Sequence, residues 1–175
     1  MSEVRGYITV KMRNELIPMY RELYHIYYML NRVCWSGTLP YCALVVSQKQ
    51  RRSWAYATPI CAAGGPLISI NSSACSLINT DIFIGIMAHE MTHIWQFSRR
   101  HRGGHGKDFK NEMGRIGLDY KNQCLYEDGP LVFTIKLHRM RNFNVTACFS
   151  TLRRGDFNRQ DQLDFYLANR RELFQ

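Results

Sequence analysis

Two histidines four residues apart, His89 and His93, constrain this chain more than any other feature, and Glu90 lies between them. On a helix, residues at this spacing share one face, so both imidazoles can reach one metal ion. Zinc suits the pair, because it binds neutral imidazoles in tetrahedral geometry and, in catalytic sites, keeps one position for water. Glu90 can accept the proton of that water as a general base. The motif therefore predicts a zinc metallopeptidase of the H-E-x-x-H type, with one zinc ion per chain.

The surroundings of the motif favour a metal site over a chance occurrence on a surface helix. The motif ends an apolar run, Ile-Phe-Ile-Gly-Ile-Met-Ala, at residues 82–88. Such a run buries the helix that carries it, and unpaired His and Glu side chains are costly in a buried position. A bound metal ion would remove that cost.

A catalytic zinc ion needs a third protein ligand. The metzincin arrangement needs Gly three residues after the second histidine, and Gln96 occupies that position. Two candidates remain. Glu112 is spaced as in the thermolysin-like arrangement, in which a Glu on the next helix is the ligand. His105 follows the flexible pair Gly103-Gly104, where the chain could turn back to the metal.

Hydrophobic periodicity predicts an α+β fold with a long N-terminal helix, a small three-stranded sheet, the motif helix and a following ligand-bearing segment. The predicted helices span residues 11–34, 82–99, 106–118 and 159–173. The predicted strands span residues 42–47, 53–59, 67–71, 131–137 and 144–149. A chain of 175 residues fits one such domain.

Residues 1–118 are the expected core, and residues 119–175 are expected to form a short α/β extension packed on it. The six cysteines include no C-x-x-C pair, so no zinc ribbon is expected in the extension. The N-terminus does not read as a signal peptide, and the apolar run beside the motif is too short to span a bilayer. A cytoplasmic or nuclear location, without membrane contact, is expected.

Four segments together resemble the SprT-like family, which includes the Spartan proteases. They are His-Glu-Met-Thr-His-Ile-Trp-Gln at residues 89–96, His-Gly-Lys-Asp-Phe-Lys at 105–110, Trp-Ser-Gly-Thr-Leu-Pro at 35–40 and Ile-Ser-Ile-Asn at 68–71. The resemblance covers roughly residues 10–118 and implies a compact zincin-like metalloprotease domain. It also implies that the His of the H-G-x-x-F segment is the third ligand, which favours His105 over Glu112.

The same resemblance implies that the chain cuts proteins bound or crosslinked to DNA, as in DNA repair, and that DNA stimulates the cleavage. Many family members carry a C-terminal zinc ribbon, whereas residues 119–175 offer only Cys124 and Cys148. DNA contacts are therefore expected from the domain itself or from the extension.

The charge of the chain also favours nucleic acid as a partner. The 23 Lys and Arg residues against 14 Asp and Glu leave a net charge of +9, which attracts polyanions. Aromatic residues beside arginines can stack unpaired bases, so DNA that is single-stranded or has single-stranded features is expected. The candidate substrate or DNA contacts are Arg51, Arg52, Trp54, Tyr56, Gln96, Arg99, Arg100 and Arg102.

An alternative hypothesis is a DNA-binding module with a structural zinc ion and little or no protease activity. It predicts DNA affinity that falls steeply with salt, folding that needs zinc, and no proteolysis in any DNA context. Glu90 argues against it, because a structural site requires no carboxylate beside its ligands. A third hypothesis is a metallopeptidase of a regulator or processing substrate, with the basic surface serving solubility or another polyanion.

Overall fold

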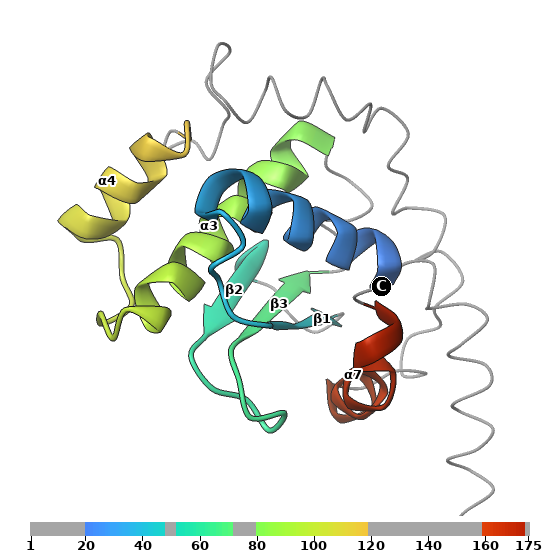
Figure 1. Ribbon diagram of the computed structural model, residues 1–175. Helices are drawn as coiled ribbons and strands as arrows, with labels where there is room; N and C mark the ends of the chain where they lie inside the picture. The colour runs from blue at the N-terminus through green and yellow to red at the C-terminus, as the bar shows by residue number, and fades with distance from the viewer. Residues whose placement is uncertain (1–19, 48–51, 72–79, 119–158, 174–175) are drawn as a thin grey trace, which may run out of the picture.

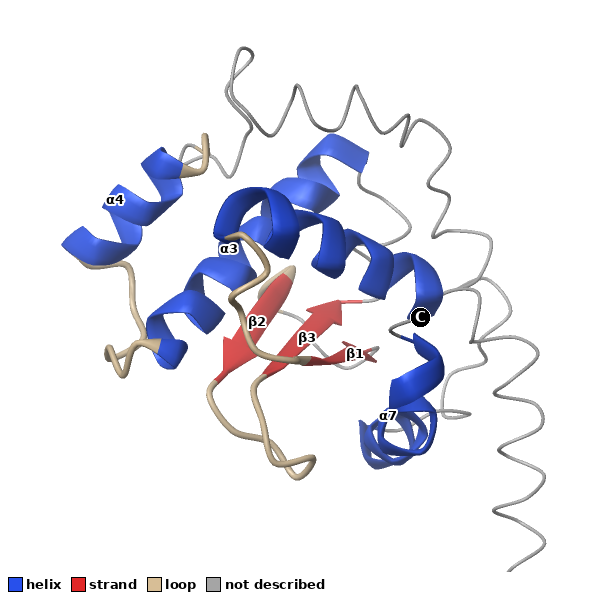
Figure 2. Cartoon of the chain, in the orientation of Figure 1, coloured by secondary structure: helices blue, strands red, loops and turns tan. Residues whose placement is uncertain are grey.

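The computed structural model describes residues 20–47, 52–71, 80–118 and 159–173. Within these ranges the predicted α+β class is confirmed, since helices pack against a small three-stranded mixed sheet (Figures 1 and 2). The strands are β1 (Ala43–Ser47), β2 (Ala55–Thr58) and β3 (Leu67–Asn71). The helices are one over residues 20–35, α3 (Thr80–Ser98), α4 (Lys107–Arg115) and α7 (Arg159–Leu173).

The observed elements follow the predicted ones closely, and β3 and α7 have the predicted bounds. The predicted first helix is present over residues 20–35, and its segment 11–19 lies outside the described residues. The predicted strands at 131–137 and 144–149 also lie outside them. The division into a core of residues 1–118 and an extension of residues 119–175 stays a prediction.

Helix α4 ends three residues earlier than predicted, because Gly117 turns the backbone. Its φ of 85° is in the left-handed region, which glycine adopts without steric cost. The N–H of Leu118 then donates to the Met113 carbonyl at 2.9 Å and the N–H of Gly117 to the Gly114 carbonyl at 3.1 Å. These two bonds form a Schellman cap, which satisfies the last carbonyls of the helix.

The sheet has the order β1-β3-β2, with β1 parallel and β2 antiparallel to β3. All five residues of β3 are buried, as is typical of a central strand covered on both faces. Strand β2 is an edge strand, in which Ala55 is buried and Tyr56 is exposed. Since α3 packs against β2, this edge of the sheet lies next to the H-E-x-x-H motif (Figure 1).

Two helices build the core against the sheet. In the helix over residues 20–35, the tyrosines Tyr20, Tyr24 and Tyr27 share a buried face, and the Tyr24 hydroxyl accepts a hydrogen bond from the Leu44 N–H at 3.0 Å. Helix α3 is buried from residue 83 to residue 92, as its apolar run predicts. No helix among the described residues is both long enough and apolar enough to span a membrane.

Helix α7 covers the other edge of the sheet through Gln162. The amide of this buried side chain accepts from the Val46 N–H and donates to the Val46 carbonyl, each at 2.6 Å. The Tyr20 hydroxyl donates to the same amide oxygen at 2.5 Å. Gln162 thus pairs with β1 as a neighbouring strand would, and this protects the edge.

Candidate metal centre

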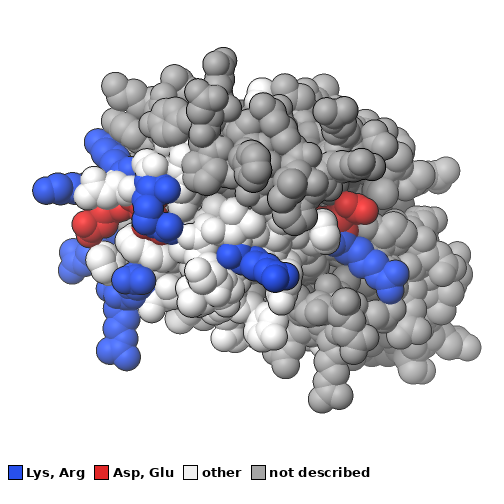
Figure 3. Space-filling model, turned by 45° about the horizontal axis from the view of Figure 1, so that its top comes forward, with Lys and Arg blue, Asp and Glu red and all other residues white. Residues whose placement is uncertain are grey.

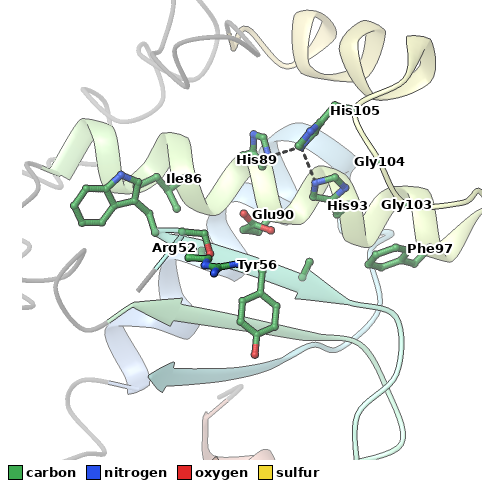
Figure 4. A pocket seen from close by; sticks show the side chains of 14 residues that line it. Arg52, Tyr56, Ile86, His89, Glu90, His93, Phe97, Gly103, Gly104 and His105 are labelled. Atoms are coloured by element: carbon green, nitrogen blue, oxygen red, sulfur yellow. Dashed lines mark hydrogen bonds between the residues drawn. The ribbon is translucent and has the colours of Figure 1, made fainter. Parts of the chain in front are cut away.

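Three imidazole rings converge at one point beside α3 (Figure 4). His89 and His93 project from α3, and His105 comes from the loop between α3 and α4. The Nε2 atom of His105 lies 3.0 Å from Nε2 of His89 and 3.2 Å from Nε2 of His93. All three candidate ligand atoms lie within 4.8 Å of one another. The structure therefore brings together the three histidines that the sequence nominates.

This arrangement fits a metal ion better than a hydrogen-bonded cluster. Bonds of about 2.0–2.1 Å in tetrahedral geometry place two ligand nitrogens roughly 3.4 Å apart, close to the spacings seen here. A single N–H on His105 Nε2 can serve only one of the two facing nitrogens well. One cation at the centre would bind all three lone pairs, and an all-imidazole set suits zinc.

Burial keeps His89 and His93 in the neutral state that binds metal. Burial, and secondly the neighbouring His93 and His105, lower the pKa of His89 to about 3. The pKa of His93 is also lowered, chiefly by burial and against the opposing effect of its hydrogen bond to Gln96. A metal ligand must be neutral, so at neutral pH the site loses no binding energy to deprotonating these two rings.

Phe109 forms the packing surface behind the three imidazoles. This fully buried ring of α4 lies 4.9 Å from His89, 4.5 Å from His93 and 4.7 Å from His105, measured between ring centroids. It limits the rotation of all three rings. The sequence predicts no role for Phe109 beyond its place in the H-G-x-x-F segment, although its fixed spacing from His105 was the available signal.

Gln96 lies in this site in a role that differs from the expected one. The sequence places it among the candidate substrate or DNA contacts, but Gln96 is only 3% exposed. Its Oε1 atom lies 2.8 Å from Nδ1 of His93, and its Nε2 donates to the Gly104 carbonyl at 3.0 Å. Both ends of the amide are used inside the protein, so Gln96 contacts a candidate ligand and the loop that carries another.

The pair Gly103-Gly104 lets the chain return from α3 to the metal centre. Gly104 has a φ of 139°, which L side chains rarely adopt. A Cβ atom on Gly103 would lie 2.8 Å from the ring of Phe97, inside van der Waals contact. Gly104 is therefore required for its backbone conformation, whereas a side chain at position 103 would have to displace the Phe97 ring.

Glu112, the other candidate third ligand, is used elsewhere. Its buried carboxylate accepts from Trp35 Nε1 at 2.8 Å and from Arg115 Nε and Nη2 at 2.9 and 2.6 Å. Arg115 also donates to the Cys34 carbonyl at 2.7 Å. Glu112 therefore fastens α4 to the end of the first helix. Among the described residues, the histidine cluster has His105 as its third member.

Glu90 lies at a cleft between α3 and β2 of about 520 Å³ (Figure 4). Glu90 as a residue is 6% exposed, and burial raises the pKa of its carboxyl group to about 8, against the opposing effect of a hydrogen bond from the backbone of Ala57. A cation held by the nearby histidines would favour the ionised form and lower this pKa. The cleft is lined by Arg52, Ser53, Trp54, Ala55, Tyr56, Ala57, Ile86, His89, Glu90, His93, Phe97, Gly103, Gly104 and His105.

The other predicted contact residues fall in two places. Arg52, Trp54 and Tyr56 line the cleft, with Trp54 46% exposed, while Arg51 lies outside the described residues. The second place is the exposed loop between α3 and His105, which holds Arg99, Arg100 and Arg102. Lys and Arg side chains gather at this end of the molecule, near α4 (Figure 3).

Arg99 in this loop lies over the ring of Trp95, with its guanidinium 5.1 Å from the ring centroid. Such a cation–π contact stabilises the position of the side chain while its guanidinium remains at the surface.

Comparison with known families covers the segment of the chain that carries this site. The model of the SprT-like family matches residues 23–127, which is more than half of the 175 residues. The matched segment contains Glu90 and all three histidines of the cluster. No curated protein and no solved structure matches the chain. On the extent of the family match, the chain belongs to the SprT-like family.

Proposed function

We propose that this chain is a zinc-dependent metalloendopeptidase that acts on proteins bound or crosslinked to DNA. The observation that carries the proposal is the convergence of three imidazole nitrogens next to a buried carboxyl group at a cleft. Membership of the SprT-like family supports a metallopeptidase-type domain. The H-E-x-x-H segment lies on α3, as in a zincin-like arrangement.

In this proposal His89, His93 and His105 hold one zinc ion, and Glu90 is the general base. Zinc in such a site supplies Lewis acidity, which polarises a carbonyl group and acidifies water. The Glu90 carboxylate accepts a proton from the attacking water and later returns it to the leaving amine. The hydrogen bond from the Ala57 backbone holds that carboxylate at the cleft. Glu90 is almost fully buried, so its electrostatic interactions are stronger than they would be at an exposed position.

The residues at the mouth of the cleft favour DNA as the partner that brings the protein substrate to the site. Arg52 supplies a positive charge there, and Trp54 and Tyr56 expose aromatic rings next to it. This combination suits an unpaired strand, whose phosphates bind cations and whose bases stack on aromatic rings. A protein held on such a strand would lie close to Glu90.

We expect Trp54→Ala to lower the affinity for a single-stranded oligonucleotide about tenfold, because one stacking contact is lost. Arg52→Ala should weaken binding for any sequence and reduce the slope of log affinity against log salt by about 1. Fluorescence anisotropy at several salt concentrations measures both effects.

Arg159→Ala is the matched control, because Arg159 is an exposed arginine of α7, which packs on the opposite edge of the sheet. It should change affinity little. Equal losses from Arg52→Ala and Arg159→Ala would mean that the binding follows net charge and that the cleft mouth is not the DNA site.

The proposed activity is tested by incubating the chain with a protein bound to single-stranded DNA and detecting fragments by mass spectrometry. Cleavage should stop when a chelator removes the metal and return when zinc is added. A protein that binds DNA and zinc but yields no fragments with any DNA would instead support the DNA-binding module with a structural zinc ion.

A further inference from the structure

The side chain of Gln96 links two of the three candidate ligands. It lies on α3 one turn after His93 and reaches that ring with one end of its amide and the backbone of Gly104 with the other. It is almost fully buried, at 3% exposure. The proposed catalytic mechanism does not use Gln96. Its two hydrogen-bond partners, a candidate ligand and the loop of another, suggest that it positions the metal ligands.

The contact with Gly104 fixes which way the amide faces. A carbonyl oxygen can only accept a hydrogen bond, so the NH₂ group of Gln96 must face the Gly104 carbonyl. The amide oxygen then faces Nδ1 of His93 at 2.8 Å and can only accept. It follows that Nδ1 of His93 carries the hydrogen. The lone pair of this neutral ring therefore lies on Nε2, the atom that faces His105.

The same contact holds the loop that carries His105. Gly104 directly precedes His105, and its carbonyl is fastened to α3 by the Gln96 side chain. The backbone carbonyl of Gln96 adds a second attachment, accepting from the His101 N–H at 2.9 Å. The loop between α3 and α4 is thus tied to the helix at two points through one residue.

We propose that Gln96 is a positioning residue: it sets the tautomer of His93 and anchors the His105 loop, so that both rings present Nε2 to one metal ion. The inference rests on the proposed metal centre. Partners that orient a metal-ligating imidazole commonly contribute about 10–100-fold to metal affinity. A lost partner should therefore weaken metal binding without removing any ligand.

Two substitutions separate the two tasks. Gln96→Leu removes both contacts, whereas Gln96→Glu keeps an oxygen that accepts from His93 and loses the donor to Gly104. The matched control is Gln162→Leu, which removes another buried glutamine with two-ended hydrogen bonding, far along the chain on α7. This control variant measures how far the loss of a buried, hydrogen-bonded amide destabilises the fold in general.

In the metal-free protein, ¹⁵N NMR of the His93 ring should show the Nδ1–H tautomer in wild type, Gln96→Glu and Gln162→Leu. In Gln96→Leu it should show the Nε2–H form or a mixture. Amide hydrogen exchange at residues 101–105 should accelerate in both Gln96 variants. Zinc affinity, measured by competition with a chelator, should fall about 10–100-fold in Gln96→Leu and less in Gln96→Glu.

A Gln96→Leu protein with the wild-type tautomer and wild-type zinc affinity would overturn the inference. An equal loss of affinity in Gln162→Leu would also overturn it, because the effect would then come from general destabilisation. A wild-type protein that binds no zinc would contradict the proposed function instead, and the tautomer and exchange measurements on metal-free protein would still decide the role of Gln96.

Discussion

Glu90→Gln should reduce cleavage of a DNA-bound protein by about 10³-fold while leaving zinc bound, because the amide cannot accept the proton of the attacking water. The substitution preserves size, and Glu90 is not one of the three ring nitrogens that converge. The metal content should therefore stay at one ion per chain. Initial cleavage rates, together with metal analysis of the same samples, measure both quantities.

Glu22→Gln is the matched control for this experiment. Glu22 is exposed on the first helix, so the same loss of one negative charge should leave the cleavage rate unchanged. A Glu90→Gln protein that cleaves as fast as Glu22→Gln would rule out the assigned general base. Loss of zinc in Glu90→Gln would instead show that this carboxylate helps to hold the metal.

His105→Ala should lower zinc affinity by at least about 100-fold, because it removes one of three protein ligands from the site.

Glu112→Gln should keep wild-type zinc affinity and lose stability instead. It weakens the ion pair with Arg115, whose side chain is 53% exposed, so the cost should be about 1–2 kcal/mol. Chelator competition should show weaker zinc binding only in His105→Ala, and thermal unfolding of the metal-free proteins should show the loss of stability in Glu112→Gln. If Glu112→Gln loses the metal and His105→Ala keeps it, the third ligand is wrongly assigned.

Local periodicity was sufficient to predict the first half of the site. The spacing of His89 and His93 fixes their common face on any helix, and the apolar run before them predicts the burial of α3. The strands β1 and β3 were predictable for the same reason, since β1 is apolar over its first four residues and β3 is rich in Leu and Ile. These features depend on a few neighbouring residues and need no knowledge of distant contacts.

The rest of the site depends on contacts between distant segments. From the residues alone, Glu112 was as suitable a ligand as His105, and the resemblance decided between them. Glu112 is not available as a ligand because its carboxylate already accepts a hydrogen bond from Trp35, which lies 77 residues away in the sequence. Such a distant contact cannot be predicted from local periodicity. The role of Gln96 was likewise hidden, because it depends on where the turn at Gly104 places one carbonyl oxygen.

X-ray absorption spectroscopy of the zinc-loaded chain tests the central claim, an open zinc centre held by three imidazoles, most directly. The account predicts one zinc ion per chain with about four nitrogen or oxygen donors at roughly 2.0–2.1 Å, three of them with the outer-shell scattering of imidazole. The fourth donor should be exchangeable solvent. A sulfur donor at about 2.3 Å, or a fourth imidazole that closes the shell, would contradict it.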